Sequence, residues 1–365
     1  MTIYAVPDAP FSVQAVVGTK ELSSLINSLL KENTSDHAAV DFDFMVNGEF
    51  LRVTLNKHLE QKGISHETIV EIEYIECHPA PKPEDSLLHD DWVSSVQGCQ
   101  DCILCGCYDN TLRLWSTSGQ PLMTIPGHSA PLKCVRWISV DGSDCRFISG
   151  SHDQTIFLWQ WNRDRNEVDC IHACRGHAGS VDCLAVDSTK QRVPILTLSG
   201  HNEGVSAASW IGDNEICTSS WDHTIRLWDI TQATQKSLLQ GTKAFFDVSY
   251  SHLNKMIITA SCDRHIRLWD PRASDGAIVK CTYSSHTGWV SSVRWSETNE
   301  YLFLSGSHDT VMKLWDTRSP KAPLYNMSGH EDKILAVDWS VPHLLLSGAA
   351  DNHLKIFRYQ DSHSS

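Results

Sequence analysis

The stretch Ser305-Gly306-Ser307-His308-Asp309, followed by Met312-Lys313-Leu314-Trp315-Asp316, decides the fold. It combines the end of one short strand, a turn with an Asp, and a second short strand that closes on Trp-Asp. Variants of it occur at five other places: Cys105–Trp115, Ser149–Trp159, Thr218–Asp229, Thr259–Asp270 and Ser347–Phe357. The turn Asp residues of adjacent units lie 41 to 46 residues apart. The chain is therefore built mainly from one repeated structural unit.

A second marker precedes most units, a His that follows Gly or Ser and leads into an alternating apolar stretch. It occurs at Gly127-His128, Gly176-His177, Gly200-His201, Ser285-His286 and Gly329-His330. Four short strands with this start, a Trp-Asp end and this period resemble the WD-repeat β-propeller. The resemblance implies a mainly β protein whose four-stranded blades form a ring, of seven blades in the family type. Because one blade cannot bury both of its faces, its neighbours must cover it.

Four polar groups of each unit form a chain of hydrogen bonds in the WD-repeat family: the His, a hydroxyl on the second strand, the turn Asp and the Trp N–H. We expect a structural network of this kind from His128, Ser149, Asp153 and Trp159; His201, Thr218, Asp222 and Trp228; Asp263 and Trp269; His286, Ser305, Asp309 and Trp315; and His330, Ser347 and Asp351. Three departures are visible: Cys105 replaces a hydroxyl, Phe357 replaces a Trp, and Gln240-Gly241-Thr242 has no His.

The third unit is short. Between His177 and His201 the sequence predicts only a first strand at Val181–Val186 and an outermost strand at Ile195–Gly200, joined abruptly at Lys190–Pro194. A full blade needs roughly 40 residues. We therefore predict six complete blades and a partial third blade. The last unit has no fourth strand of its own, and Ser86–Leu88 is predicted to supply it and to cover the C-terminal edge.

Two patterns within the repeats have a second interpretation. A His, an Asp and a Ser in one unit fit a hydrolytic triad, but their recurrence in nearly every unit favours a scaffold role. A run of Cys residues fits a zinc or iron–sulfur site, at Cys99, Cys102, Cys105 and Cys107. Two of these occupy second-strand positions that hold Ser149 and Ser151 in the next unit, and no matching ligand pair is evident. We predict no cofactor, no metal site within this chain and no catalysis.

Composition narrows the function classes. The chain of 365 residues has 41% hydrophobic and 20% charged residues, which is typical of a globular protein. A formal charge of −14 disfavours general binding to phosphate backbones, so any RNA contact is expected to be mostly indirect. No apolar run reaches the roughly 18–20 residues of a membrane span, and the start of the chain does not resemble a signal peptide. Thirteen Cys residues without such a signal predict a reducing compartment. We expect neither a membrane nor a small-molecule substrate among the partners.

Residues 1–77 lie outside the repeat and predict a separate α+β domain. Its expected elements are an opening strand at Thr2–Val6, a helix from about Thr19 to Leu30, strands at Val40–Val46 and Phe50–Val53 joined by Asn47-Gly48, a helical turn at Leu55–Gln61 and a closing strand at Val70–Tyr74. This order resembles the ubiquitin-like β-grasp fold. Residues 78–85 are predicted to be a Pro-rich linker, 86–359 the propeller and 360–365 a tail.

A ubiquitin-like module ahead of a WD-repeat ring resembles the Notchless-like N-terminal domain of ribosome-assembly factors. Within these factors the chain is similar to the Ytm-type ribosome-biogenesis family over essentially its whole length. The strings that carry the similarity include His89-Asp90-Asp91-Trp92-Val93-Ser94-Ser95, Cys174-Arg175-Gly176-His177-Ala178-Gly179-Ser180-Val181-Asp182, Asp263-Arg264-His265-Ile266-Arg267-Leu268-Trp269-Asp270-Pro271-Arg272 and Lys321-Ala322-Pro323-Leu324-Tyr325. The short opening strand and the partial third blade depart from the family, whose members carry the missing strands.

The resemblance implies a scaffold subunit of the PeBoW complex, with pescadillo and the block-of-proliferation protein. This complex matures the large (60S) ribosomal subunit and its 28S and 5.8S rRNAs in the nucleus, in nucleolus and nucleoplasm. The ring is expected to bind the block-of-proliferation protein. The ubiquitin-like domain is expected to dock on midasin, an AAA-type ATPase, whose pulling releases the complex from the pre-60S particle.

One residue is singled out by this resemblance. An acidic side chain of the ubiquitin-like domain completes the coordination of a Mg²⁺ ion held by midasin, and by position it is Glu67, in the turn before the closing strand. A lone carboxylate on a rigid loop suits this role because Mg²⁺ prefers hard oxygen ligands in octahedral geometry. The residues alone also allow a simpler role, in which Glu67 solubilises or caps a turn.

A rival hypothesis is a WD-repeat substrate receptor or adaptor of a ubiquitin ligase. Against it, the chain shows no F-box-like helices, and its ubiquitin-like module has no free Gly-Gly tail. The partner face of the ring is not defined by the sequence. Trp92, Trp221 and Trp289 lie outside the third-strand Trp positions and are candidates either for partner contacts or for interior packing.

Overall fold

The computed structural model describes residues 6, 10, 12–33, 39–65, 68–186, 196–273 and 279–360. The chain divides into two compact units, which we describe separately. The first is built on Met1–Ala80, and the second consists of Pro81–Thr317 and Pro323–Tyr359. Within the described ranges, no helix is long and apolar enough to cross a membrane.

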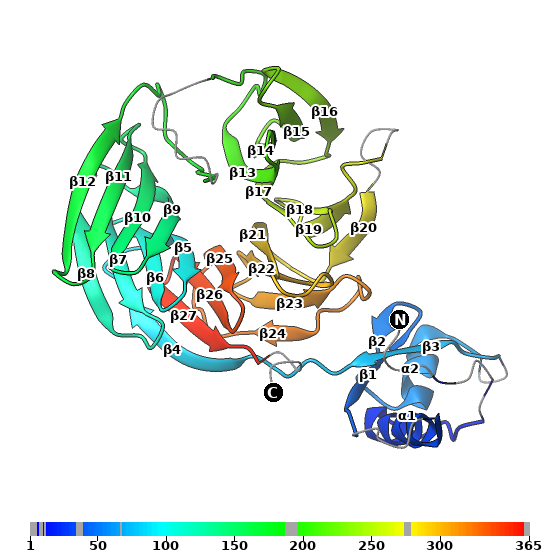
Figure 1. Ribbon diagram of the computed structural model, residues 1–365. Coiled ribbons are helices and arrows are strands. Elements are labelled where there is room, and N and C mark those ends of the chain that lie inside the picture. The colour runs from blue at the N-terminus through cyan, green and yellow to red at the C-terminus, as the bar shows by residue number, and fades with distance from the viewer. Residues whose placement is uncertain are drawn as a thin grey trace. The chain divides into compact units, whose positions relative to one another are not determined.

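The first unit packs two helices against a small antiparallel sheet (Figure 1). Its elements are α1 (Thr19–Asn33), β1 (Phe42–Val46), β2 (Glu49–Phe50), α2 (Leu55–Lys62) and β3 (Ile72–Glu76), and the strand order is β2-β1-β3. The central strand β1 is buried along its whole length, and Leu22 and Leu30 of α1 pack on it with Leu59 of α2. The predicted β-grasp order of helix, hairpin, helix and closing strand is confirmed for these elements.

Local chemistry explains where the helices begin and end. The Glu21 carboxylate accepts a hydrogen bond of 2.9 Å from the N–H of Gly18 at the start of α1, where backbone donors lack helical partners. Helix α2 stops at Gly63, whose φ of 65° is left-handed and suits glycine. Of the predicted opening strand, Thr2–Ala5 lie outside the described residues, and Val6 is not in a strand.

The second unit is a ring of six four-stranded antiparallel sheets, in which the first strand of each sheet lies toward the centre (Figure 1). Blade 1 is β5–β8 (Val93–Cys99, Cys102–Cys107, Thr111–Ser116, Pro121–Pro126), blade 2 is β9–β12 (Leu132–Asp141, Asp144–Ser151, Ile156–Asn162, Glu167–Cys174), blade 4 is β13–β16 (Val205–Gly212, Glu215–Ser220, Thr224–Asp229, Thr234–Gln240), blade 5 is β17–β20 (Phe245–Tyr250, Ile257–Ser261, His265–Trp269, Val279–Ser284), blade 6 is β21–β24 (Val290–Trp295, Leu302–Ser307, Met312–Asp316, Tyr325–Met327), and blade 7 is β25–β27 (Ile334–Val341, Leu344–Ala349, His353–Arg358) with β4 (Lys82–Leu88).

The final blade is completed by the start of the second unit, as predicted. Strand β4 pairs antiparallel with β27, so that Leu88 lies opposite His353 and Leu87 opposite Leu354. The strand begins at Lys82, which is earlier than the sequence predicts, so the last part of the predicted linker belongs to the sheet. Leu87 is the buried residue of this otherwise exposed strand and packs in the core between blades 7 and 1.

The partial third blade differs from the prediction. Residues 175–186 and 196–204 carry no strand, so the strands predicted at Val181–Val186 and Ile195–Gly200 are wrong for their described residues. The physical reason is that an isolated first strand has no second strand to pair with. The segment still occupies its place in the ring: the Val181 N–H donates to the Ser151 carbonyl at 3.0 Å, and the Cys183 thiol lies 3.6 Å from the Val205 carbonyl.

The blade faces next to this segment are incompletely covered. In blade 1, four side chains that face the next blade are buried: Leu104, Leu112, Leu114 and Ile125. Their counterparts in blade 2, by strand register, are only half-buried: Ile148, Ile156, Leu158 and Cys174. On the far side, Trp210 and Ile216 of blade 4 are also half-buried, whereas Trp137 and Phe147 of blade 2 are buried. Half-burial forfeits on the order of 1 kcal/mol per large apolar side chain.

Candidate functional sites in the ring and the N-terminal domain

Blade 6 contains the complete predicted network of polar side chains. The indole N–H of Trp315 donates to the Ser305 hydroxyl at 2.8 Å, and that hydroxyl lies 2.7 Å from Nε2 of His286. Nδ1 of His286 lies 2.8 Å from the Asp309 carboxylate. Trp315 and Ser305 are fully buried. Hydrogen-bond donation therefore runs in one direction, from Trp to Ser to His to Asp, with the His proton on Nδ1.

The same network recurs in three other blades. Blade 2 forms it from His128, Ser149, Asp153 and Trp159, blade 4 from His201, Thr218, Asp222 and Trp228, and blade 7 from His330, Ser347 and Asp351, with side-chain distances of 2.8–2.9 Å. Phe357 occupies the Trp position of blade 7, as the sequence indicated. The structure thus brings together all the residues predicted for these networks.

The environment sets the charges of the network. Burial lowers the pKa of His286, and the hydrogen bond to Asp309 only partly offsets this effect. Burial by itself raises the pKa of Asp309, but the hydrogen bond from His286 and the backbone N–H groups of Thr287 and Val311 outweigh it and hold that pKa well below its usual range. The pair is therefore a neutral imidazole donating to a carboxylate near neutral pH.

Two blades use different partners. In blade 1, where Cys105 replaces the hydroxyl, Trp115 Nε1 donates directly to His89 Nε2 at 3.3 Å, and burial lowers the pKa of His89 to about 4. In blade 5, which lacks the His, Asp263 pairs with Arg267 at 2.5 Å. Trp269 of the same blade still donates to a hydroxyl, that of Thr259, at 2.9 Å. The network therefore tolerates the loss of one member when another donor or acceptor is at hand.

These geometries support a scaffold role for the network. A serine nucleophile must be accessible to substrate and free to give its proton to the His. The hydroxyls of Ser149, Ser305 and Ser347 are fully buried, and two of them already accept an indole N–H. The repeated Ser, His and Asp side chains connect the second strand of a blade, and the turn that leads to its third strand, to the segment just before its first strand.

The cysteine run lies in and beside strand β6. Cys102, Cys105 and Cys107 are buried in this strand. Burial raises the pKa of the Cys102 thiol to about 12 and that of the Cys107 thiol to about 11, so both are neutral thiols near neutral pH. In the described part of the chain, no group of three or more His, Cys, Asp or Glu side chains could hold a metal ion.

Aromatic side chains gather at one end of the strands around the ring's centre. Trp92 packs on Tyr108 at a centroid distance of 5.3 Å, and the Lys333 ammonium lies 4.3 Å from the Trp92 centroid. Trp289 packs on His308 at 5.4 Å and is 51% exposed, while Trp221 is 46% exposed. Trp92 is therefore packed within the surface, whereas Trp221 and Trp289 are available for contacts.

The sequence singled out Trp92, Trp221 and Trp289 but not the aromatic side chains around them, which are Tyr108, His152, Phe246 and His308. Tyr108, His152, Trp221 and His308 each directly precede the turn Asp of their blades, and Phe246 is the second residue of β17. The signal that could have found them is this recurrent position, because it always lies at the same end of the second strand.

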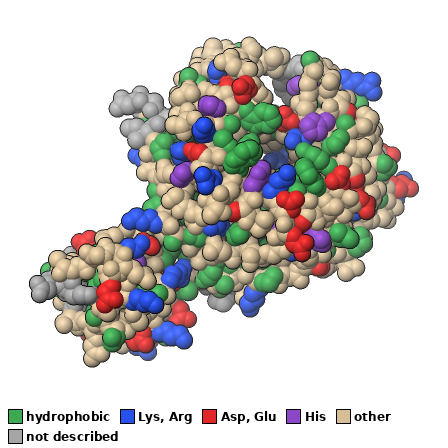
Figure 2. Space-filling view, turned by 180° about the vertical axis from the view of Figure 1, so that it is seen from behind, with side chains coloured by type: hydrophobic (Ala, Val, Ile, Leu, Met, Phe, Trp, Pro, Cys, Tyr) green, Lys and Arg blue, Asp and Glu red, His purple; other side chains and the backbone are tan. Residues whose placement is uncertain are grey.

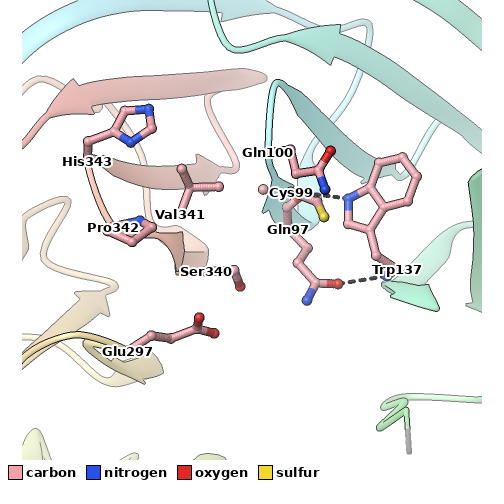
Figure 3. Close-up of a pocket in the computed structure, with 10 residues that line it drawn as sticks. Gln97, Cys99, Gln100, Trp137, Glu297, Ser340, Val341, Pro342 and His343 are labelled. Carbon is pink, nitrogen blue, oxygen red and sulfur yellow. Dashed lines mark hydrogen bonds between the residues drawn. The ribbon is translucent and has the colours of Figure 1, made fainter. Parts of the chain in front are cut away.

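A separate pocket of about 530 Å³ lies among the strand ends of blades 1, 2, 6 and 7 (Figure 3). The Trp137 backbone N–H donates to Gln97 Oε1 at 2.8 Å, and Trp137 Nε1 donates to the Gln97 carbonyl at 3.1 Å. Burial and the carboxylate of Asp338 raise the pKa of Glu297, which also lines this pocket. His343 lies on the opposite side of the pocket from Trp137 (Figure 3).

In the N-terminal domain, Glu67 lies outside the described residues, and so does His66. The described residues on either side belong to the connection between α2 and β3, where the Thr68 hydroxyl donates to the Ser65 carbonyl at 2.8 Å. Ile69, which follows Thr68, is 84% exposed. Single exposed apolar side chains are common on protein surfaces, so this exposure alone does not define a contact site.

Together, blades with the His–Ser–Asp–Trp network define a WD-repeat β-propeller protein. Comparisons with known proteins agree. Residues 2–59 match the NLE (NUC135) domain, and six segments match the WD domain, G-beta repeat: 82–116, 119–160, 192–229, 234–270, 278–316 and 321–358. No repeat match falls between 160 and 192, where the third blade is incomplete.

Two relatives are both described as "Ribosome biogenesis protein WDR12 homolog". That of Ixodes scapularis is 50% identical over 408 aligned residues, covering 98% of this chain and 96% of the relative. That of Aedes aegypti is 49% identical, covering 97% and 92%. The chain belongs to the WDR12 (Ytm-type) family of ribosome biogenesis proteins. The first alignment is longer than this chain of 365 residues, so that relative carries residues without a counterpart here.

Proposed function

We propose that this protein is a non-catalytic scaffold of large (60S) ribosomal subunit assembly that acts in the PeBoW complex with pescadillo and the block-of-proliferation protein. In this proposal it supports maturation of 28S and 5.8S rRNA in the nucleolus and nucleoplasm. The observation that carries the proposal is the combination of an NLE domain with a WD-repeat ring in a chain about half identical to WDR12 homologues over nearly its full length.

The N-terminal domain is proposed to dock on midasin, with Glu67 as the carboxylate that completes the coordination of midasin's Mg²⁺. Two features of the described neighbours support this assignment. The Thr68 hydroxyl donates to the Ser65 carbonyl at 2.8 Å, which joins the two described residues on either side of positions 66 and 67. Ile69, two positions further along the chain, is 84% exposed and offers an apolar side chain to a docked partner. Among the described residues, the buried hydrophobic core of the domain lies on α1, β1, β2 and α2 and on the chain between β2 and α2, and not on the connection between α2 and β3.

The test is binding of the full chain to midasin's isolated adhesion domain in the presence of Mg²⁺. Glu67→Ala is expected to abolish binding, because an octahedral Mg²⁺ site loses its protein-supplied sixth ligand. Glu71→Ala is the matched control: it removes an exposed carboxylate from the same connection and is expected to bind as the original chain does. Retention of binding by Glu67→Ala, with the ring still bound to its own partner, would refute the assignment.

The ring is proposed to bind the block-of-proliferation protein, and its incomplete third blade is proposed to weaken that contact. The support is the half-burial of apolar side chains on both sides of the third blade. Insertion of a complete blade between Val186 and Leu196 is expected to raise both thermal stability and partner affinity. Equal values for the two proteins would contradict the proposal.

Affinity capture from cells with mass spectrometry separates this function from a ubiquitin-ligase receptor. Recovery of pre-ribosomal RNA, pescadillo and the block-of-proliferation protein is expected. Recovery of cullin components in their place would favour the rival.

A further inference from the structure

A small cavity of about 250 Å³ opens among the first strands of the blades, at the end of the ring that carries the exposed tryptophans. Its charged lining residues are Lys133, Arg136, Arg294, Asp182 and Asp247. Two of the three cations, Arg136 and Arg294, occupy equivalent positions of β9 and β21, and both line this cavity. The pairing of these charges decides what the cavity can bind.

Arg294 forms an ion pair within the protein. Its Nη1 donates to the Asp247 carboxylate at 2.7 Å and to the Val293 carbonyl at 2.7 Å. The same Asp247 oxygen accepts from the Ser292 hydroxyl at 2.8 Å and from the Val293 N–H at 3.0 Å. This pair is therefore electrically neutral and leaves little of the Asp247 carboxylate for another cation.

Arg136 is not matched. Its one hydrogen bond within the described residues goes to the carbonyl of Val135, at 2.8 Å, and it forms no ion pair with a described carboxylate. The nearby Asp182 accepts from the Ser180 hydroxyl at 2.7 Å instead. Burial and the neighbouring Arg294 lower the pKa of Arg136. A guanidinium has five N–H donors, so most of those of Arg136, which lines the cavity, have no acceptor among the described residues.

A poorly paired charge in a confined site is costly, and a bound anion removes that cost. The rim of the cavity is apolar and aromatic: Trp221, Phe246, Tyr108 and His308 line it. Phe246 packs on His308 with a centroid distance of 6.4 Å, and the Lys133 ammonium donates to the Tyr108 hydroxyl at 3.2 Å. Figure 2 shows hydrophobic, His, basic and acidic side chains around the hollow at the centre of one ring face.

We propose that this cavity binds one acidic side chain, Glu or Asp, of an extended segment of a protein partner. The carboxylate pairs with the Arg136 guanidinium, whose planar fork matches its two oxygens. Apolar residues beside the acidic one pack on the aromatic rim, chiefly on the exposed Trp221. This binding site concerns the ring alone and does not depend on the docking of the N-terminal domain.

The observations favour a peptide over a nucleic acid. Proteins that bind single strands use grooves with many cations along the backbone, whereas this cavity has one unmatched guanidinium. The cavity is also smaller than the 300–1,000 Å³ typical of sites that enclose small molecules, yet it admits a single extended side chain. The formal charge of the chain, −14, opposes the approach of a polyanion to the rest of the surface.

The test is selection of a random peptide library, displayed on phage, against the immobilised full chain. Enriched peptides are expected to share one Glu or Asp next to an aromatic or aliphatic residue. A synthetic peptide of the enriched sequence is then titrated by fluorescence anisotropy. Its counterpart with Gln in place of Glu, or Asn in place of Asp, is expected to bind at least about tenfold more weakly.

Three variants connect this loss to the cavity. Arg136→Met and Arg136→Lys are both expected to weaken the acidic peptide at least about tenfold, since Lys keeps the charge but loses the fork. Arg272→Met, which removes an exposed guanidinium bonded to Asp270, is expected to leave binding unchanged. The comparison of acidic and amide peptides on the unaltered chain needs no variant, so it holds even where an Arg136 variant misfolds.

Several results would overturn the proposal: no enriched peptide, enriched peptides without an acidic residue, equal affinity for the acidic and amide peptides, or full affinity in a folded Arg136→Met protein. Tighter binding of a ten-nucleotide poly(U) RNA than of any peptide, lost in Arg136→Met, would also overturn it and assign the cavity to nucleic acid.

Discussion

The Ser305 hydroxyl is the centre of the blade 6 network, so its removal measures what the network contributes to stability. In Ser305→Ala, the Trp315 indole N–H loses its acceptor, and His286 Nε2 loses its donor. All three groups are buried. Each buried polar group left without a partner costs about 1–3 kcal/mol, and partial relaxation brings the expected total to about 2–4 kcal/mol.

Thermal unfolding followed by calorimetry gives the readout. For a unit of this size, about 3 kcal/mol lowers the midpoint by roughly 5–10 °C. Ser129→Ala is the control: it removes an exposed hydroxyl and is expected to change stability by less than about 0.5 kcal/mol. In a Trp315→Phe background the cost of Ser305→Ala is expected to fall, because the indole N–H is already absent. A loss below about 0.5 kcal/mol in the single variant would refute the reasoning.

Two further predictions follow from burial. Because burial lowers the pKa of His89 to about 4, the unfolded chain binds a proton there at a pH where the folded ring does not. Stability is therefore expected to fall as pH drops from about 6.5 toward 4, by up to about 1.4 kcal/mol per pH unit for this group, and urea midpoints between pH 7.5 and 5 measure it. A flat profile in that window would contradict a neutral, buried His89. Leu314→Ala is expected to lower the free energy of unfolding by about 2–5 kcal/mol, because Leu314 is fully buried. Leu158→Ala, at the equivalent but half-buried position of blade 2, is expected to lower it by about half as much. Equal losses in urea unfolding would mean that the partial third blade covers blade 2 fully.

The sequence was sufficient to predict most of the ring. The repeated Asp and Trp positions, such as Asp309 and Trp315, specify second and third strands locally, and the closing role of Ser86–Leu88 follows from the strand missing after Phe357. The prediction of a strand at Val181–Val186 was wrong because the alternating pattern of this segment does not show that the second strand of its blade is missing. A strand is a cooperative feature of a sheet, and local propensity cannot replace an absent neighbour.

The candidate sites were less predictable for a different reason. The exposure of Trp221 and the packing of Trp92 depend on side chains from other blades, so their spacing in the chain does not distinguish them. The lack of a carboxylate for Arg136 is likewise a property of the assembled ring, because it depends on Arg294 having taken Asp247. Glu67 rests on family resemblance and stays a prediction.

The pairing of β4 with β27 also has a mechanical consequence. The N-terminal domain connects to the ring at Lys82, which is the first residue of β4. Tension applied to that domain therefore reaches the ring through this one strand, and six residue pairs with β27 and the buried Leu87 are the first bonds to bear it. Strand β4 therefore both closes the ring and connects it to the N-terminal domain. The shear strength of the β4–β27 pairing sets the force at which blade 7 would open if the N-terminal domain were pulled.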